Sequence, residues 1–269
     1  MDVKITPARC AGHELTVGIC TSGSRIKLTL LAGGKFYGVS KKCLNQEKVL
    51  FPMLDRLLAP HKAGLKDIGA LCVITGPGRF TGLRVGLTLA SVLKTLAGIP
   101  VLSSTLFEIL AAQAAASKEL RAWASGRKEP RLAALVHAFK DEYFCQVFGA
   151  RGARRAARDA EYRCKPLGEP RWLKDVELTA YLQSLGTETY VIADAEEKPE
   201  IYSLVPAGLE KAPARISKIL PEFIIKTGLA LKNRNLAPLY LKPARYELEN
   251  RPAGTQNTVC RTRAESGGL

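Results

Sequence analysis

The chain has 269 residues, of which 46% are hydrophobic, and 40 Lys and Arg against 25 Asp and Glu give it a net charge of +15. These values predict a globular protein with a sizeable core, and the positive charge favours association with polyanions. No apolar run reaches the roughly twenty residues that span a bilayer. Residues 1–14 also lack the apolar core of a signal peptide, so we expect a cytoplasmic protein with no membrane partner.

The cysteines and histidines do not form a recognisable metal or disulfide pattern. The seven cysteines are odd in number and contain no Cys-x-x-Cys pair, and the three histidines are far apart in the sequence. We therefore expect reduced thiols and no metal site.

The first part of the chain reads as a meander followed by alternating helices and strands. Alternation of polar and apolar residues predicts strands at 14–19, 26–31 and 35–39. Helices are then expected at 45–59, 81–97 and 105–117, with strands at 70–74 and 100–103. This order predicts a mixed α/β sheet with right-handed crossovers.

A charged, turn-rich passage at 117–130 is expected to separate two lobes. We place an N-terminal lobe at 1–117 and a smaller C-terminal lobe at 131–250, and we expect residues 251–269 to be disordered because they contain few apolar residues. The predicted elements of the second lobe are a hairpin of 131–138 and 142–148, a helix at 176–185, a strand at 190–193, and a helical stretch at 216–232 that Pro221 interrupts.

A basic stretch at 151–171 carries a local excess of four positive charges. Few aromatic residues accompany its arginines, with Tyr162 inside it and Trp172 directly after it, so a stacking platform for bases is poorly supported. The pattern favours a solvated basic loop over a surface that follows RNA phosphates.

The most informative segment joins the strand at 70–74 to the helix at 81–97. It begins with Gly76, Pro77, Gly78, Arg79, Phe80 and Thr81 and continues to Gly86. The N-terminus of a helix favours anions, but Gly-Leu-Arg at 82–84 is not the Gly-Lys-Ser/Thr of a Walker A loop, and Thr81 stands where a dinucleotide-binding turn needs glycine. We therefore interpret the segment as a structural turn, with Thr81 as the helix N-cap.

This segment resembles the GPGSFTGLRIG signature of the TsaB (YeaZ) family, bacterial proteins that support threonylcarbamoylation of adenosine in tRNA, with Arg79 where serine is usual. Residues 50–58 resemble the family's first helix and residues 97–101 its helix-to-strand link, and fainter similarity covers 136–144 and 238–242. The resemblance implies an actin-like (ribonuclease-H-like) two-lobed α/β fold with a reduced second lobe.

The resemblance also implies that catalytic chemistry is missing. Actin-like kinases hold the nucleotide's metal with an aspartate at the end of the first strand, and Cys20 stands at that position. A thiol does not replace a hard oxygen ligand for magnesium. No neighbouring group in the sequence is evident that would lower the pKa of Cys20, so we interpret it as a packed thiol and expect no intrinsic catalysis, metal or cofactor.

The helix at 81–97 is apolar around nearly its whole circumference and therefore needs cover on every side. We expect one side to pack on its own sheet and the other, with the helix at 45–59, to bind another protein. Burial by the second lobe of the same chain is the alternative. The expected partner-binding residues are Phe51, Leu54, Leu58, Gly82, Leu83, Gly86, Leu87 and Ala90.

By resemblance, such proteins look like catalytically silent relatives of TsaD that pair with it, or with themselves, through these two helices, while the ATPase TsaE joins the assembly. We expect a non-catalytic scaffold that stabilises a TsaD-like subunit for threonylcarbamoylation of N6 of adenosine 37 in tRNA. The tRNA would be contacted indirectly, and ATP and metal would sit on partner subunits. The alternatives are a standalone actin-like nucleotide-dependent enzyme, a glycoprotease-type hydrolase, or an RNA-binding module suggested by charge alone.

Overall fold

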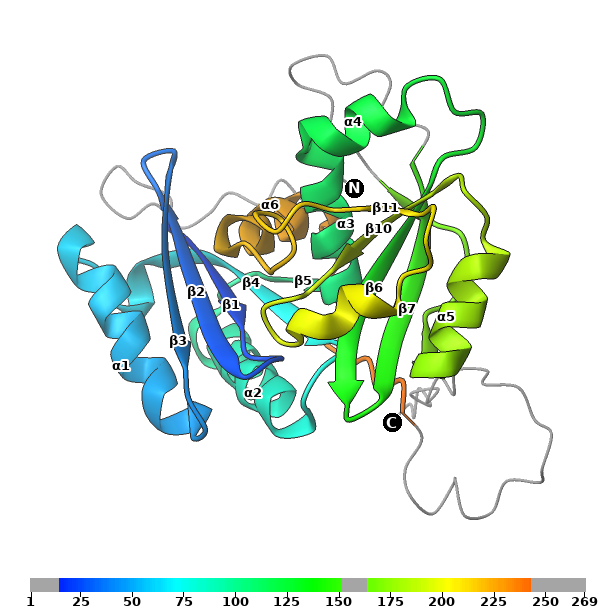
Figure 1. The fold of residues 1–269 in the computed structure, drawn as a ribbon. Helices are drawn as coiled ribbons and strands as arrows, with labels where there is room; N and C mark the ends of the chain where they lie inside the picture. The colour runs from blue at the N-terminus through cyan, green and yellow to red at the C-terminus, as the bar shows by residue number, and fades with distance from the viewer. Residues whose placement is uncertain (1–14, 151–163, 243–269) are drawn as a thin grey trace, which may run out of the picture.

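Two β-sheets organise the chain in this computed structural model, which describes residues 15–150 and 164–242 (Figure 1). The first sheet has the strand order β3-β2-β1-β4-β5, in which β1 to β3 form an antiparallel meander and β4 and β5 run parallel to β1. Its strands are β1 (Leu15–Cys20), β2 (Arg25–Ala32), β3 (Lys35–Lys42), β4 (Ile68–Gly76) and β5 (Val101–Thr105). The predicted meander is confirmed.

The second sheet has the order β11-β10-β6-β7-β8, and β9 also pairs with β7. The predicted hairpin is its antiparallel pair β6 and β7, and β10 runs parallel to β6. Its strands are β6 (Arg131–Phe139), β7 (Glu142–Gly149), β8 (Lys165–Pro166), β9 (Arg171–Lys174), β10 (Thr189–Ala193) and β11 (Glu210–Lys211). Three of these strands are shorter than five residues, so this sheet is the less regular of the two.

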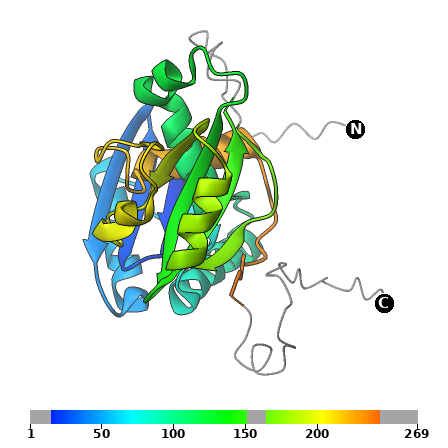
Figure 2. The same cartoon turned by 45° about the vertical axis from the view of Figure 1, so that its right-hand side comes forward.

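Helices cover and separate the two sheets (Figures 1 and 2). The outer face of the first sheet carries α1 (Gln46–Leu58) and α2 (Phe80–Ala97), and the outer face of the second carries α5 (Asp175–Ser184). Between the sheets lie α3 (Leu106–Ala116), followed by α4 (Lys118–Ala124), and α6 (Pro221–Leu231). Short 3₁₀ helices are η1 (Ala59–His61), η2 (Leu65–Asp67) and η4 (Pro199–Leu204).

The alternation of side chains along β1 explains how one strand serves two layers. Val17 and Ile19 are fully buried in the core under α1 and α2. Gly18 faces the opposite way, where a Cβ would lie 3.0 Å from side-chain atoms of both Ile224 and Ile225 on α6. Glycine at this position lets α6 approach the sheet closely.

The end of the described chain belongs to the first lobe, which differs from the predicted boundary at 131–250. α6 packs on β1, β2, β4 and β5, so its apolar face is covered by the first sheet. The chain then runs along that sheet, where the Ser103 amide donates to the Asn233 carbonyl at 2.8 Å and the Leu239 amide to the Thr75 carbonyl at 2.7 Å. The predicted disordered tail at 251–269 lies outside the described residues.

Three element boundaries also differ from prediction. The passage expected to be a turn at 117–130 contains α4. α2 begins at Phe80 with Arg79 as its N-cap residue, not Thr81. α6 begins at Pro221 instead of being kinked by it, because proline is well tolerated in the first turn of a helix.

α2 is, among the described residues, the one helix long and apolar enough to cross a membrane. Core helices of soluble proteins pass the same test. Its residues Leu87, Ala90 and Leu93 are buried against the first sheet, so α2 is a core helix of the first lobe.

Candidate functional site

The signature turn forms a seat for the loop between β1 and β2. A Cβ on Gly78 would lie 2.5 Å from the Ser22 carbonyl oxygen, and one on Gly82 would lie 2.1 Å from the Thr21 carbonyl oxygen. At Gly86 the nearest atom would be the Thr21 hydroxyl oxygen, at 2.5 Å. Glycines at four-residue steps therefore make room for a loop of the same chain, not for a helix of a partner.

The backbone of the turn is engaged on a second side as well. Arg79 donates its amide to the Ser22 carbonyl at 2.8 Å. Gly76 has φ +137°, a conformation that suits glycine alone, and a Cβ there would lie 2.8 Å from the Leu239 carbonyl oxygen. Two segments of the chain hold this turn, which supports a structural turn and not an open phosphate loop.

Most of the residues expected to bind a partner are part of the chain's own core. On α1, Leu54 and Leu58 are at most 1% exposed, whereas Phe51 is 46% exposed. The predicted residues of α2 are also buried, namely Gly82, Leu83, Gly86, Leu87 and Ala90. The predicted surface is therefore corrected at seven of its eight positions, because a helix on a sheet turns its most apolar stripe inward.

Other residues form the solvent side of the two helices. Val92 is 44% exposed and Leu96 82%, and both lie on α2. Phe80, at the start of α2, is 51% exposed and carries the Arg84 guanidinium 3.8 Å above its ring. We call Phe51, Phe80, Arg84, Val92 and Leu96 the outer helix face.

The sequence contains a signal for this face that apolar counting misses. Arg84, Thr88, Ser91 and Thr95 are all exposed and recur at three- and four-residue steps along α2. Such spacing places them on one side of a helix. The polar and small residues, not the leucines, mark the outward direction of α2.

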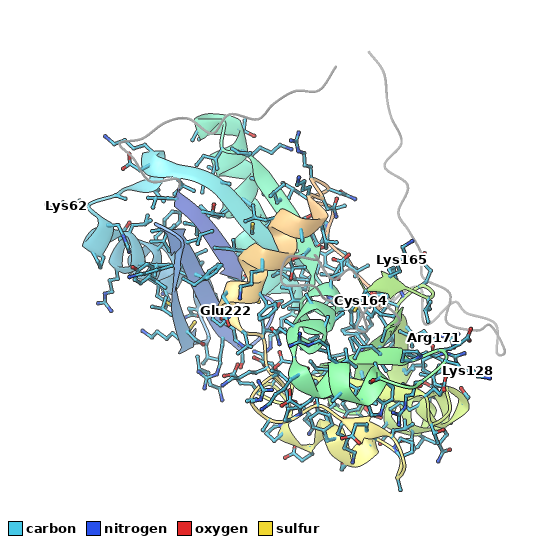
Figure 3. All side chains as sticks on the ribbon, turned by 90° about the horizontal axis from the view of Figure 1, so that it is seen from above. Lys62, Lys128, Cys164, Lys165, Arg171 and Glu222 are labelled. Atoms are coloured by element: carbon cyan, nitrogen blue, oxygen red, sulfur yellow. The ribbon has the colours of Figure 1, made fainter. Side chains whose placement is uncertain are left out.

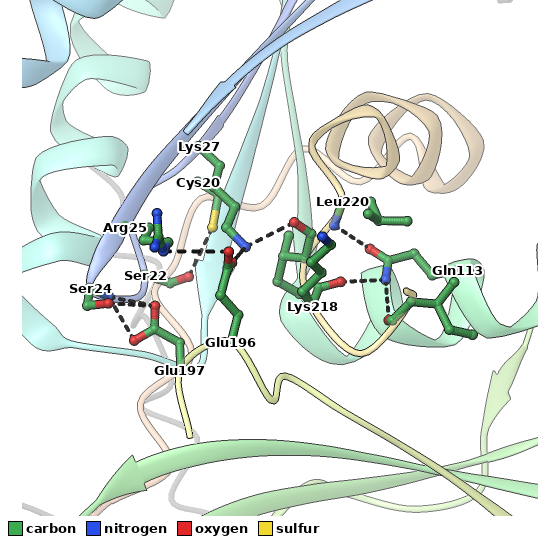
Figure 4. A network of polar contacts seen from close by, with 12 residues as sticks. Cys20, Ser22, Ser24, Arg25, Lys27, Gln113, Glu196, Glu197, Lys218 and Leu220 are labelled. Carbon is green, nitrogen blue, oxygen red and sulfur yellow. Dashed lines mark hydrogen bonds and ion pairs between the residues drawn. The ribbon is translucent and has the colours of Figure 1, made fainter. Parts of the chain in front are cut away.

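A polar network joins the two lobes between the β1–β2 region and the segment after β10 (Figure 4). The Lys27 ammonium group, in a residue only 5% exposed, pairs with the Glu196 carboxylate and donates to the Ile219 carbonyl at 3.0 Å. Ser24 binds the Glu197 carboxylate through its amide, at 2.9 and 3.0 Å, and through its hydroxyl at 2.9 Å. These contacts fasten the first sheet to the second lobe.

Gln113 of α3 extends the network to the segment before α6. Its side-chain amide donates to the carbonyls of Ile216 at 3.1 Å and Lys218 at 2.8 Å, and its carbonyl accepts from the Leu220 amide at 2.8 Å. All polar atoms of this buried side chain are thus used to fix the path of the chain into α6.

Asp194 is the most perturbed acid at the lobe interface. It directly follows β10, is 3% exposed, and its Oδ1 has no hydrogen-bond partner among the described residues. Burial raises its pKa to about 6, Lys27 lowers it, and Glu197 and Glu196 raise it further. Lys27 is therefore the positive charge that three neighbouring carboxylates share.

Cys20 lies beside this group as a packed thiol. It is 3% exposed, and its Sγ lies 3.1 Å from the Ser22 hydroxyl oxygen. Burial raises the pKa of Cys20, although the Ser22 hydrogen bond and the charge of Lys27 lower it. A thiol with a raised pKa is a poor nucleophile, and the described ranges contain no cluster of three His, Cys, Asp or Glu side chains that could hold a metal.

Comparison with known sequences places the chain in a family. It is 37% identical over 100 residues to tRNA threonylcarbamoyladenosine biosynthesis protein TsaB of Haemophilus influenzae, across 37% of this chain and 39% of that protein. TsaB of Bacillus subtilis is 24% identical over 177 residues, across 64% of this chain and 76% of that protein. The chain belongs to the TsaB (YeaZ) family. A TsaB of Buchnera aphidicola is 28% identical over 102 residues, across 38% and 49%.

The sequence matches cover only part of these relatives. The chain spans less than half the length of the Haemophilus and Buchnera proteins. Residues 44–160 also match the family model described as TsaD: tRNA N6-adenosine threonylcarbamoyltransferase. That match contains the signature turn and the outer helix face.

Solved structures confirm the predicted actin-like, two-lobed α/β fold of the family. YeaZ from Pseudomonas aeruginosa superposes with a TM-score of 0.58 at 17% identity, across 85% of this chain and 100% of that one. A second structure, described as an uncharacterized protein with similarity to peptidase YeaZ from the same organism, gives 0.60 at 19% identity with the same coverage. At these identities the likeness concerns the fold alone.

Proposed function

We propose that the chain is a non-catalytic, cytoplasmic scaffold subunit that binds and stabilises a TsaD-like subunit for threonylcarbamoylation of N6 of adenosine 37 in tRNA. The observation that carries this proposal is the outer helix face. Phe51, Val92 and Leu96 remain exposed on two helices whose inner sides are fully packed. Exposed apolar side chains gathered on one face mark a protein contact, and the names of the relatives supply the pathway.

The lobe interface supports the non-catalytic part of the proposal. Cys20 stands where actin-like kinases carry a metal-binding carboxylate, and Lys27 with Glu196 bridges the lobes beside it. We therefore assign ATP and metal to partner subunits, including a TsaE-like ATPase. The same outer helix face is also available for pairing with a second copy of the chain.

The partner contact is tested by placing charge on the outer helix face. The double variant Val92→Glu and Leu96→Glu should no longer co-elute with a TsaD-like subunit from a sizing column, because two charges would be desolvated without partners. The matched control is Val176→Glu on α5, whose side chain is 76% exposed on the other lobe. Co-elution of the double variant at the wild-type level would contradict the proposal.

Two further measurements separate the alternatives. Leu87→Glu would test folding and not pairing, because Leu87 is 8% exposed, so unchanged melting temperatures of the outer-face variants are required. Calorimetric titration of the isolated chain with ATP and magnesium should show no binding. Binding would favour the standalone actin-like enzyme.

A further inference from the structure

The positive charge of the described chain is concentrated on the first lobe. Residues 15–105 contain 12 Lys and Arg against 3 Asp and Glu, a net charge of +9. The remaining described residues, 106–150 and 164–242, contain 17 against 15, a net charge of +2. An attractive field for polyanions is therefore centred on the first sheet and its helices.

Much of this charge lies along the free edge of the first sheet, which β3 forms. Every residue of β3 is exposed, and the strand contains no acid. Five exposed lysines from three elements share this edge, and we name them with their neighbouring rings the basic edge: Lys35, Lys41 and Lys42 of β3, Lys62 directly after η1, and Lys226 of α6. No carboxylate in the described part of the chain forms an ion pair with any of them.

Aromatic rings connect these lysines into one strip. The Lys226 ammonium lies 5.1 Å from the ring centroid of Phe36 on β3 and 4.6 Å from that of Phe223 on α6. Tyr37, the next residue of β3, stacks edge-on against His61 with centroids 4.7 Å apart. Phe36 and Tyr37 are 38% and 40% exposed, so the strip offers both rings and charges to solvent.

We infer that the basic edge is an RNA-contacting surface. Proteins bind the unpaired parts of RNA by combining ammonium groups that follow the phosphates with aromatic rings on which bases stack. Both components are present here, on elements that the fold holds together. The inference rests on the proposed function only for the identity of the RNA, which would be the tRNA substrate.

Protection of the sheet edge and pairing of two copies each account for less of the arrangement. Lysines on an edge strand prevent unwanted pairing of strands. That role suits Lys35, Lys41 and Lys42, but not Lys62 and Lys226 on neighbouring elements. Pairing of two copies along β3 would bring lysines of one copy against those of the other, which is repulsive. A polyanion satisfies all five charges together.

The basic edge is separate from the basic stretch that the sequence singles out. Lys62 lies at the outer end of the first lobe, whereas Lys165 and Arg171 lie on the second lobe (Figure 3). Arg171 is also engaged within its lobe, where its guanidinium lies 4.3 Å from the Tyr181 ring centroid. Beside β3 runs α1, so an RNA at the basic edge would lie next to a subunit bound to the outer helix face (Figure 1).

Charge reversal in the full-length chain tests the location of the contact. The readout is the fluorescence anisotropy of a labelled, unmodified tRNA titrated at several salt concentrations. The edge variant combines Lys35→Glu, Lys62→Glu and Lys226→Glu. The matched control changes the net charge equally at exposed lysines elsewhere and combines Lys118→Glu, Lys165→Glu and Lys218→Glu.

The two triple variants should behave differently. The edge variant should bind tRNA about tenfold more weakly or worse near 0.1 M salt, and its slope of log affinity against log salt should be smaller by about two to three, because three phosphate contacts are lost. The control should change the affinity by less than about threefold through the distant field alone. Equal losses in the two variants would overturn the inference.

The aromatic part of the surface has its own test. Phe36→Leu with Tyr37→Leu should weaken binding about fivefold or more with an unchanged salt slope, because stacking and not charge is removed. Displacement of the tRNA by polyglutamate of equal total charge would overturn the inference in favour of an acidic protein. Co-elution of the edge variant with a TsaD-like subunit is measured in parallel, so that loss of the RNA contact is distinguished from failure of the proposed scaffold role.

Discussion

The buried carboxyl group of Asp194 should make the chain less stable as the pH rises through the weakly acidic range. Its pKa is raised from 3.8 to about 6 by burial. Between these values the folded chain retains a proton that the unfolded chain has released, so the folded state binds more protons. The free energy of unfolding therefore falls with increasing pH across this window and is constant above it.

The shift sets the size of the effect. A rise of about two pKa units at about 1.36 kcal/mol per unit corresponds to about 3 kcal/mol. Asp194→Asn removes the titration but keeps the shape of the side chain. The free energy of unfolding of the variant relative to wild type should therefore increase by about 3 kcal/mol between pH 3.5 and pH 7.5. A constant cost from the new buried amide shifts this difference equally at every pH.

Urea unfolding of both proteins across this pH range measures the difference directly, since titrations elsewhere in the chain are common to the two and cancel. The midpoints should diverge as the pH rises, in favour of Asp194→Asn. Parallel curves would refute the reasoning. Repeating the pair in a Lys27→Met background should enlarge the divergence, because Lys27 is the group that lowers the pKa of Asp194.

Three further outcomes follow from the same contacts. Gly82→Ala should destabilise the chain by about 3 kcal/mol in urea titrations, because its Cβ would meet the Thr21 backbone, which cannot rotate away. Lys27→Met alone should cost about 3 kcal/mol at pH 7, the lower end for a broken buried pair, because the side chain of its partner acid is still 27% exposed. Peptide mapping after iodoacetamide treatment should find Cys43 alkylated in the native chain, whereas Cys20 should react only after unfolding.

The sequence predicts the fold well where its hydrophobic pattern is regular. The strands of the first sheet and the helices α1, α2 and α3 lie within a few residues of their predicted positions. α4 was missed because its seven residues are too few for a periodic signal, and they lie between charged, turn-forming neighbours. The lobe boundary differs because α6 returns to a sheet formed more than a hundred residues earlier, which no local pattern reports.

The candidate site was harder to predict because two packing solutions share one pattern. Glycines at 82 and 86 suit a close helix partner and a close loop equally well, and only the tertiary structure shows that Thr21 fills the space. The lobe interface was missed altogether. Lys27 and Glu196 are 169 positions apart, so their pairing leaves no trace in sequence spacing.

The crowding of acids around Lys27 gives a reason for cysteine at position 20. Asp194 already raises the pKa of Cys20 through its charge, so the two groups interact electrostatically. An aspartate at position 20, the usual family residue, would add a fourth carboxylate to a group that one lysine already serves. Cys20→Asp should therefore destabilise the chain at pH 7 and less so at pH 5, where protonation relieves the repulsion.

Magnesium distinguishes this crowding of acids from a dormant metal site. If Lys27 fixes the lobes around a group that needs only one positive charge, millimolar magnesium should leave the melting temperature of Cys20→Asp unchanged, because Lys27 excludes a second cation by repulsion. Stabilisation by magnesium in Cys20→Asp but not in Cys20→Ser would mean that a metal position persists between the lobes. The loss of the carboxylate would then be the only barrier to nucleotide chemistry, and the non-catalytic assignment would depend on one residue and not on the architecture of the lobe interface.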